Sequence, residues 1–345
     1  MVAALWLALW FDVRLGEPPA RWHPVVWIGN YLNFVARRLS LGTRQAVVGQ
    51  ADTQSFFLGA MAWMIGAAIV LILTMGIQWA FSQVLAGMPM AVSGSLSGTA
   101  GLKALIQMLV AVGLANIVLA GLLKCMMAWA MLQSEVLALE AALNPSQGGS
   151  LSRGRERLRW MVSRDVSALS ETQVRESAIE SLAENLNDSV VAPIFWFLLF
   201  GLPGAALYRY ANTADAMWGY RGHYQGRNWE WAGKWAARVD DVMSWLPARL
   251  TALLMATLAG GLSLRALRKQ AGRTPSPNSG WPMAAMAMAL KVSLGKPGVY
   301  ILNPDHPPPG AADTLRATLL ASKVVVALVF VVIPAICLLA FRLSR

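Results

Sequence analysis

Three stretches of the chain consist almost entirely of hydrophobic residues, and their lengths are typical of membrane-spanning helices. Residues 56–81 contain no charged side chain, and neither do residues 104–123 and 324–341. A helix that crosses the hydrocarbon core of a bilayer needs about 20 consecutive apolar residues. The pattern therefore predicts three transmembrane helices at these positions.

Three further apolar stretches are shorter or interrupted. Residues 190–208 are long enough to cross a bilayer, but Pro203 and Gly204 break them. Residues 250–264 are short, and residues 1–11 are shorter still. Interrupted segments of this kind form half-spans or re-entrant pieces where protein or a water-filled cavity satisfies their backbone polar groups.

Basic residues are concentrated in some of the connecting segments, and this distribution predicts the orientation. Residues 13–55 hold five arginines and residues 133–189 hold six, whereas residues 82–103 hold a single lysine. Because Lys and Arg accumulate in cytoplasmic loops, the two Arg-rich segments are predicted to be cytoplasmic and the third to be external. Residues 209–249 carry six basic residues and would also lie inside. Residues 190–208 are therefore expected to re-enter or to lie at the interface rather than to cross once.

The composition supports a membrane protein. Of the 345 residues, 56% are hydrophobic and 14% are charged, whereas ordinary soluble domains carry about 25% charged residues. The net charge of +11 is explained by basic cytoplasmic loops, so no nucleic-acid partner is predicted. Cys125 and Cys337 lie in apolar runs, which indicates neither a disulfide framework nor a zinc site. No basic segment precedes the first apolar stretch, so no cleaved signal peptide is expected.

The predicted fold is an all-α polytopic integral membrane protein with helical cytoplasmic loops and candidate re-entrant segments. A single membrane domain is expected over residues 1–345. The acidic residues are unevenly distributed, because thirteen of the eighteen lie between residues 133 and 249. The main polar site is therefore expected within residues 150–250, together with residues 12–30 and 274–300.

One acidic stretch, ESAIESLAENLND (176–188), has a carboxylate at every fourth position. The SETQ sequence before it is a capping-box pattern, which predicts a helix that begins after Ser170. A rotation of about 100° per residue puts the carboxylates on one face and apolar residues on the other. These carboxylates are Glu176, Glu180, Glu184 and Asp188. The simplest interpretation is an amphipathic helix with a solvated polar side.

The charge pattern of this stretch also favours a functional site. Solvated helix faces usually mix signs, because like charges one turn apart destabilise a helix by about a few tenths of a kcal/mol. A cation would relieve that repulsion, and Glu184 and Asp188, beside the amide of Asn185, offer the hard oxygen ligands that suit Mg²⁺. Alternatively, a carboxylate crowded by others has a raised pKa and can act as a base near neutral pH. The sequence leaves both alternatives open.

Polar residues gather in several other motifs. The candidate binding residues in these motifs are Arg164 and Asp165 in VSRD, Asn212, Asp215 and Arg221 in YRYANTADAMWGYR, Asp240 and Asp241 in ARVDDVMSWLPARL, and Asn278 in SPNSGWP. His23 lies in the proline-rich LGEPPARWHP, where a structural turn is the simpler interpretation. The sequence contains no GxxxxGK[ST] phosphate loop, HExxH or GxSxG motif, so no standard nucleotide-binding or hydrolase site is indicated.

Six motifs, taken together, resemble one family. They are LGEPPARWHPVVWIG, VSRD, ESAIESLAENLNDSVVAPIFW, YRYANTADAMWGYR, AARVDDVMSWLPARLTA and SPNSGWPMAAMAMAL. In this order, over residues 12 to about 300, they resemble the adenosylcobinamide-phosphate synthases, the cobalamin-biosynthesis membrane proteins called CobD or CbiB. The chain departs from the family pattern at three positions. Glu17 replaces the Asp of Gly-Asp-Pro, Ser163 replaces the Gly of VGRD, and Lys296 replaces the second Gly of Gly-Gly-Pro.

The resemblance implies a carbon–nitrogen ligase of the bacterial cytoplasmic (inner) membrane. Such enzymes join adenosylcobyric acid to aminopropanol phosphate through an amide bond at the expense of ATP, with Mg²⁺ expected beside the nucleotide. ATP would activate the corrinoid carboxylate as an acyl phosphate, which the amine then attacks. The expected partners are these two substrates, the lipid bilayer and other cobalamin-biosynthesis enzymes.

The resemblance also implies roles for particular residues. The carboxylates would bind Mg²⁺ and deprotonate the incoming ammonium, and the arginines would bind phosphate as two-toothed donors. The expected catalytic residues are Glu180, Glu184, Asp188 and Asp215, and the expected metal ligands are Glu184 and Asp188. The expected substrate-binding residues are His23, Arg164, Asp165, Asn185, Asn212, Arg221, Asp240, Asp241 and Asn278.

Two other classes of function are considered. A transporter for a corrinoid or another anion would carry acidic residues inside its spans, but the three predicted spans contain none. A non-enzymatic membrane regulator or sensor of the same superfamily would not need the motifs rich in Asn and Asp. The ligase is therefore the preferred prediction.

Overall fold

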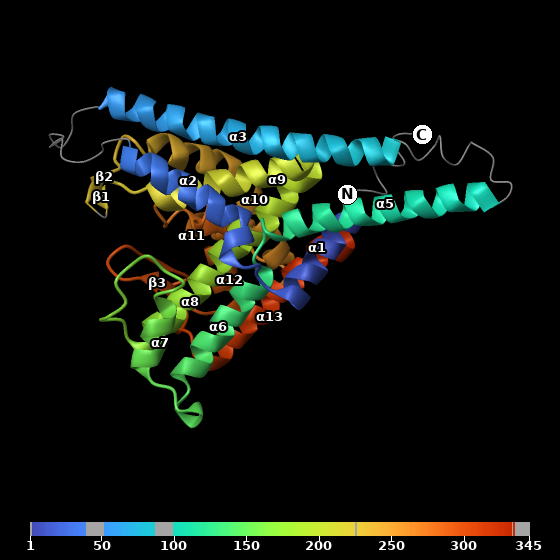
Figure 1. Ribbon diagram of the computed structural model, residues 1–345. Helices are drawn as coiled ribbons and strands as arrows, with labels where there is room; N and C mark the ends of the chain where they lie inside the picture. Colours follow the sequence, from blue (N-terminus) through green and yellow to red (C-terminus); the bar gives the residue numbers. More distant parts are fainter. Residues whose placement is uncertain (1, 39–51, 87–98, 225, 333, 335–345) are drawn as a thin grey trace. The chain divides into compact units, whose positions relative to one another are not determined.

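The computed structural model describes residues 2–38, 52–86, 99–224 and 226–332 and residue 334. Within these ranges the chain forms helices and two short antiparallel hairpins (Figure 1). Three of the helical stretches are long and apolar enough to cross a membrane. The prediction of an all-α integral membrane protein is thus confirmed.

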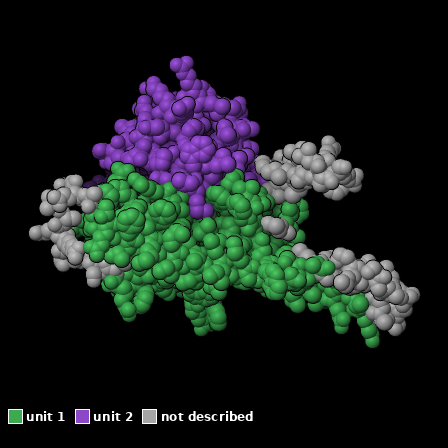
Figure 2. All heavy atoms as spheres, turned by 90° about the horizontal axis from the view of Figure 1, so that it is seen from above, with its two compact units in different colours: residues 1–127, 193–240 green, residues 128–192, 241–345 purple. Residues whose placement is uncertain are grey.

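The chain divides into two compact units (Figure 2). Unit 1 comprises residues 1–127 and 193–240, and unit 2 comprises residues 128–192 and 241–345. Each unit is therefore built from two separate stretches of the sequence. That both units belong to one membrane domain remains a prediction.

Unit 1 contains the two longest uninterrupted apolar helices. Its elements are α1 (Val2–Leu15), η1 (Ala20–Trp22), α2 (Pro24–Arg38), α3 (Thr53–Ala86), α5 (Thr99–Lys124), α9 (Ala192–Trp218) after its first residue, β1 (His223–Tyr224), β2 (Arg227–Asn228) and the first part of α10 (Lys234–Leu258). Within this unit α5 packs against α1 and α3, and α2 packs against α3.

Helices α3 and α5 confirm the predicted spans at residues 56–81 and 104–123. The stretches long and apolar enough to cross a membrane are Thr53–Val84 and Leu102–Lys124. In their most apolar windows only 28% and 11% of the residues are buried. Most of their hydrophobic side chains are therefore available to contact lipid, as expected of membrane-spanning helices whose surroundings are apolar.

The third predicted span is covered only in part. Residues 324–341 begin within α13 (Ala311–Ala327) and continue as the π-helical η4 (Leu328–Val332), and the rest of the prediction falls outside the described residues. The third stretch long and apolar enough to cross is Glu171–Trp218. It includes the interrupted residues 190–208, for which re-entry or an interfacial position remains a prediction.

The interruption in this stretch lies at Gly201 rather than at the predicted Pro203 and Gly204. Gly201 has φ 67° and ψ −153°, a conformation that is open to glycine and strained for other residues. The backbone N–H of the next residue, Leu202, donates to Oε1 of Gln78 on α3 at 2.8 Å. A polar side chain from a neighbouring apolar helix thus satisfies the backbone group beside the break, as a membrane environment requires.

The two weakest apolar stretches are helical but short. Of residues 1–11, residues 2–11 lie in α1 and residue 1 falls outside the described residues. Helix α1 has 14 residues, where a full crossing needs about 20. Residues 250–264 supply the end of α10, and the helix stops before Gly260 and Gly261, which both have positive φ. Neither apolar stretch is therefore long enough to cross a bilayer alone.

Unit 2 is built around α8. Its elements are α6 (Trp129–Leu143), η2 (Pro145–Gln147), α7 (Leu151–Leu158), α8 (Glu171–Leu186), the π-helical η3 (Asn187–Val191), the second part of α10, α11 (Leu264–Ala271), α12 (Gly280–Leu290), β3 (Leu294–Lys296), β4 (Tyr300–Leu302), α13 and η4. Helix α8 packs against α6, α7, α12, α13 and β3.

Helix α8 begins where the sequence predicts. The Ser170 hydroxyl accepts the backbone N–H of Gln173 at 3.2 Å, and the Gln173 side chain accepts the backbone N–H of Ser170 at 2.8 Å. This reciprocal capping box satisfies two N–H groups at the start of the helix. The apolar side of α8, which includes Val174 and Ala178, is buried in a core with Leu139 and Leu158.

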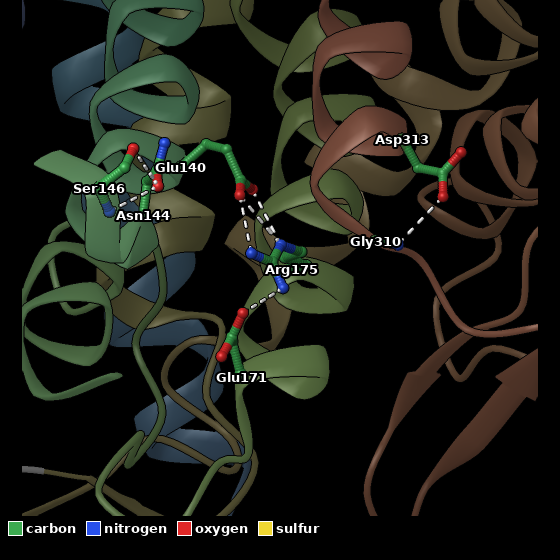
Figure 3. Close-up of polar contacts among 7 residues, drawn as sticks. All are labelled: Glu140, Asn144, Ser146, Glu171, Arg175, Gly310 and Asp313. Atoms are coloured by element: carbon green, nitrogen blue, oxygen red, sulfur yellow. Dashed lines mark hydrogen bonds and ion pairs between the residues drawn. The ribbon is translucent and has the colours of Figure 1, made fainter. Parts of the chain in front are cut away.

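A buried ion pair also holds α8 against α6 (Figure 3). The guanidinium of Arg175 donates to both carboxylate oxygens of Glu140, with distances of 2.8 to 3.1 Å, and to Glu171 at 2.6 Å. Bidentate ion pairs of this kind fix the geometry of the two side chains as well as contributing to stability. The ion pair therefore fixes α8 against α6, and with it the position of the polar residues on the other side of α8.

Candidate active site

The acidic side of α8 is not a solvated face. Glu180 is only 5% exposed, Ser177 and Asn187 are also buried, and Glu184 and Asp188 are half-buried. Charged side chains are rarely buried unless they are paired or functional. The simplest interpretation of the acidic stripe is therefore wrong, and the question becomes what surrounds these carboxylates.

Two of these carboxylates, those of Glu180 and Glu184, border a small cavity of about 180 Å³ within unit 2. Its walls come from the segment that precedes α8, from α8 itself, from α12 and from the β3–β4 hairpin. The polar residues that line it are Ser163, Arg164, Ser177, Glu180, Ser181, Glu184, Asn185, Lys296 and Tyr300. Met161, Val162 and Met283 supply the apolar part of the wall. The cavity thus combines carboxylates, cations and hydroxyls in one small volume.

Arg164 and Glu180 are the central charged pair of this cavity. Nη2 of Arg164 lies 3.8 Å from Oε2 of Glu180 and donates a hydrogen bond to the Ser177 hydroxyl. The Ser177 hydroxyl in turn donates to the backbone oxygen of Gln173 at 2.6 Å. Yet Oε1 of Glu180 and Nε of Arg164, both buried, have no hydrogen-bond partner among the described residues. Buried polar atoms without partners are uncommon, so the cavity presents one acceptor and one donor that a ligand could satisfy.

A larger cavity of about 840 Å³ adjoins the first one in unit 2. It is bordered by Thr172, Gln173 and Glu176 at the start of α8 and by Arg273 and the hairpin residues. Lys296 and Tyr300 line both cavities. They are directly paired across the two antiparallel strands, so their side chains lie on the same face of the hairpin. This pair therefore forms the wall that the two cavities share.

Tyr300 is electrostatically coupled to the carboxylates. Burial and the negative charges of Glu180 and Glu184 raise the pKa of its hydroxyl well above the usual value. The hydroxyl therefore stays protonated at physiological pH. The protonated Tyr300 hydroxyl donates a weak hydrogen bond to the sulfur of Met283 at 3.8 Å and also interacts with the Glu180 carboxylate at the boundary of the two cavities.

Four predicted site residues meet at the small cavity, namely Arg164, Glu180, Glu184 and Asn185. The Asn185 amide donates to the Ser181 backbone oxygen at 3.0 Å and to its hydroxyl at 3.3 Å. These contacts orient Asn185 along the cavity wall. The grouping was predicted from the α8 stripe and the VSRD motif.

Two other predicted residues near α8 do not line either cavity. The exposed Asp165 accepts the backbone N–H and the hydroxyl of Ser167, each at 2.9 Å, and these hydrogen bonds lower the pKa of its carboxyl. Asp188 accepts the side-chain amide of Asn187 at 2.8 Å. The structure thus gives Asp165 a local role in a turn, and it separates Asp188 from the residues that surround the cavity.

Asn278 braces two segments of unit 2. The Asn278 side chain is buried. Its Oδ1 accepts a hydrogen bond from Nη1 of Arg249 at 3.0 Å, and its amide donates a hydrogen bond to the backbone oxygen of Asp241 at 2.7 Å. The Arg249 guanidinium also lies over the rings of Trp245 and Trp281, 4.2 and 4.9 Å from their centroids. Burial lowers the pKa of Arg249. These contacts give Asn278 a structural role in joining α10 to the start of α12.

Five predicted site residues belong to unit 1. They are His23, Asn212, Asp215, Arg221 and Asp240. The Asn212 amide lies 3.4 Å from Oδ1 of Asp240, and Arg221 is exposed in the turn after α9. Asn212 and Asp240 were predicted from separate motifs and are thus brought together in one unit.

A buried charge cluster in unit 1 explains the first motif. Lys124 at the end of α5 is 4% exposed, and its Nζ lies 2.6 Å from Glu17 and 3.6 Å from Asp12. Nε2 of His23 lies 3.1 Å from Oε2 of Glu17, the same oxygen that Lys124 contacts, and Nδ1 of His23 accepts a hydrogen bond from the backbone N–H of Val25 at the start of α2. Burial alone would raise the pKa of Glu17, but its hydrogen bonds with His23 and Lys124 lower that pKa below the usual value. These contacts agree with the structural turn that the proline-rich motif favours, and substrate binding by His23 remains a prediction.

The sequence interpretation did not assign four charged or polar residues that surround the cavities. Glu176 belongs to the acidic stripe but was not chosen as a site residue, and Lys296 was noticed only as a departure from the family pattern. Arg273 and Tyr300 had no signal of their own. They are brought to α8 by the hairpin and by the segment after α11, which lie far from α8 in the sequence.

No preformed metal site is evident in the described part of the chain. No group of three His, Cys, Asp or Glu residues there is arranged to hold a metal ion. Mg²⁺ commonly arrives with substrate phosphates and needs only one or two protein carboxylates. Glu180 and Glu184 at the cavity are compatible with this mode of binding, whereas the pairing of Glu184 with Asp188 remains a prediction.

Comparisons with known proteins agree with the motifs. The family model described as CobD/Cbib protein matches residues 5–329. A probable cobalamin biosynthesis protein CobD of Methanothermobacter thermautotrophicus is 36% identical, covering 87% of this chain and 86% of its own. The cobalamin biosynthesis protein CobD of Chromobacterium violaceum is 38% identical, covering 91% and 88%. That of Klebsiella pneumoniae is 34% identical, covering 87% and 84%.

No solved structure matches the chain. The family model and the curated relatives nevertheless extend over nearly all of it, across both units and across every motif named above. The chain therefore belongs to the CobD/CbiB family of cobalamin biosynthesis proteins.

Proposed function

We propose that this protein is an adenosylcobinamide-phosphate synthase, which joins adenosylcobyric acid to aminopropanol phosphate in an ATP-dependent reaction. One observation carries the proposal. A buried carboxylate, Glu180, lies beside Arg164 in a cavity that opens next to a much larger one. A reaction between a carboxylic acid, a phosphorylated amine and ATP needs such a combination of basic groups, acidic groups and space.

The reaction can be written in two balanced steps. A carboxylate oxygen of the corrinoid attacks the γ-phosphorus of ATP, which forms an acyl phosphate as the bond to ADP breaks. The ammonium of the second substrate loses a proton to a base, and its nitrogen then attacks the acyl carbon. The C–N bond forms, the C–O bond to phosphate breaks, and the nitrogen loses a second proton.

The residues around the cavity suit these tasks. Glu180 and Glu184 can accept the proton from the ammonium. Arg164 and Lys296 can bind phosphate oxygens, Arg164 with the planar donor pair that matches them. Tyr300 can donate a hydrogen bond to an oxygen at the boundary of the cavities. Mg²⁺ held by Glu180 or Glu184 would neutralise phosphate charge when bound.

The same proposal assigns a location and partners. The Arg-rich segment 133–189 would face the cytoplasm, where ATP is available, and α3 and α5 would anchor the protein in the bacterial cytoplasmic membrane. Other enzymes of cobalamin biosynthesis would supply the corrinoid acid and take up the product. The transporter and regulator alternatives gain no support from the cavities described above.

Product formation by the isolated protein tests the proposal. The full chain in lipid nanodiscs is incubated with ATP, Mg²⁺, adenosylcobyric acid and aminopropanol phosphate. We expect adenosylcobinamide phosphate together with equal amounts of ADP and phosphate. Folded protein that yields no product and hydrolyses no ATP would refute the proposal.

A matched pair of variants links this activity to the cavity. Glu180→Gln removes the buried base, and general acid–base groups contribute about 10²- to 10⁴-fold to rates, so kcat should fall in that range. Because a buried carboxylate costs free energy, the variant should be at least as heat-stable as the parent. Glu156→Gln, an exposed acid on α7 that lines neither cavity, serves as the control and should leave turnover unchanged.

A further inference from the structure

The two cavities of unit 2 differ greatly in size, and the difference bears on which substrate each can hold. Cavities for drug-sized ligands measure about 300–1,000 Å³. The larger cavity, of about 840 Å³, falls within this range, and the smaller, of about 180 Å³, falls below it. Neither a nucleotide nor a corrinoid can enter the small cavity as it stands. A ligand of only a few carbon atoms can.

The chemistry of the small cavity narrows the ligand further. Glu180 is more than nine-tenths buried, and its Oε1 has no hydrogen-bond partner within the described part of the chain. The buried Nε of Arg164, on the opposite member of the ion pair, equally lacks an acceptor there. An ammonium would satisfy the first atom and a phosphate oxygen the second. A small molecule that carries both a positive and a negative group fits this arrangement.

We propose that the small cavity is the binding site of the amine substrate, a short-chain amino-alcohol phosphate, and that the reacting groups of the acid and the nucleotide approach it from the larger cavity. The identification of the amine rests on the proposed function. Glu180 and Glu184 hold the ammonium, and the guanidinium of Arg164 holds the phosphate. Lys296 and Tyr300, which line both cavities, separate the amine from the activated acid until the two react.

The arrangement makes the cavity volume a determinant of specificity. Met161 and Met283 close the apolar part of the wall, so the carbon chain between the two charged ends has limited room. Phosphorylated amines with two or three carbons between the groups should bind best. Longer chains and amines without phosphate should bind more weakly, because they exceed the volume or leave Arg164 without its acceptor.

Ser163 allows a test that does not disturb the core. It lines the small cavity but is exposed, so Ser163→Leu can narrow the cavity without burying a new group in the packed interior. Ala168→Leu is the matched control, because Ala168 is exposed on the same segment and lines neither cavity. Ser163→Val provides a smaller obstruction if the leucine variant is unstable. Thermal unfolding of each variant verifies that it is folded.

Binding is measured by calorimetry with the full chain in nanodiscs, in the presence of adenosylcobyric acid and a non-hydrolysable ATP analogue. Ser163→Leu should raise the Kd for aminopropanol phosphate at least about tenfold, equivalent to about 1.4 kcal/mol. Ala168→Leu should not change it, and neither variant should change the Kd for the nucleotide. Unphosphorylated aminopropanol and inorganic phosphate, tested separately, should each bind more weakly than the complete ligand.

Three results would overturn the proposal. They are no binding of aminopropanol phosphate by the parent protein under these conditions, equal binding by the parent and Ser163→Leu, and a parallel loss of nucleotide binding in Ser163→Leu. Calorimetry also separates this proposal from the proposed function. A protein that binds the amine phosphate in the small cavity but forms no amide would refute the ligase activity alone.

Discussion

Arg164 shows at the scale of single residues how a short motif acquires a function. It lies in VSRD, which has no regular secondary structure, yet its guanidinium contacts Ser177 and Glu180 of α8. The neighbouring Asp165 instead closes a local turn with Ser167. Two adjacent charged residues thus differ in role because only one points toward the cavity.

Arg164→Lys should separate phosphate binding from simple charge pairing. Lysine keeps the positive charge but loses the planar pair of donors, and a hydrogen bond to a charged group contributes about 1.5–3 kcal/mol. The KM for aminopropanol phosphate should therefore rise about ten- to a hundredfold, with less effect on the unphosphorylated amine. Steady-state kinetics with both amines provides the measurement.

Arg159→Lys is the matched control, since Arg159 is exposed and lines neither cavity. It should leave both KM values unchanged. If Arg164→Lys and Arg164→Ala also kept the parent values, Arg164 would have no part in the site.

At the scale of single elements, Gly201 determines where the helical stretch of α9 is interrupted. An apolar helical stretch is interrupted at one glycine, and a glutamine from another helix accepts the N–H group beside the break. The proline two residues later cannot donate a hydrogen bond at all. Helix α9 therefore depends on α3 for its backbone hydrogen bonding at this point.

Gly201→Ala should destabilise unit 1. A side chain at this φ and ψ costs about 1–3 kcal/mol, and the added Cβ would overlap the side chain of Gln78. We expect a lower Tm and lower yield of folded protein in detergent. Gly76→Ala on α3 is the control, because Gly76 has no neighbour within 4 Å of an added Cβ. An unchanged Tm for Gly201→Ala would mean that the break is not needed.

At the scale of the whole molecule, the orientation in the membrane determines which surfaces are accessible to the ATP of the proposed reaction. The basic segment 133–189 contains α7 and α8 and therefore most of the proposed site. The segment 82–103, with one lysine, begins in the last residues of α3 and ends in the first residues of α5. The positive-inside rule predicts that the first segment is cytoplasmic and that the second is external.

Cysteine labelling in intact cells tests this orientation. In a chain that lacks Cys125 and Cys337, Ser152→Cys should resist a membrane-impermeant thiol reagent and should react only after the cells are broken open. Ser82→Cys, exposed at the end of α3, should react in intact cells. The reverse pattern would contradict the orientation and the proposed access to ATP.

Much of the fold could be predicted, because its signals are local. The lengths of two charge-free runs predicted α3 and α5, the capping box predicted the start of α8, and the alternation of acidic and apolar positions predicted its buried side. Ordered motifs along the chain indicated the family. In each case the residues that carry the signal are the residues that form the feature, so no knowledge of distant contacts was needed.

By itself, then, the sequence determined the membrane class, two spans, the first residue of α8 and the family. Only the tertiary structure decided that the carboxylates of α8 are buried, that Lys296 and Tyr300 close the cavity beside Arg164, and that Asn278 is a brace. It also moved the break in α9 to Gly201, opposite Gln78. The physical reason is that burial, cavities and paired charges arise where segments far apart in the chain pack together, and local patterns do not specify that packing.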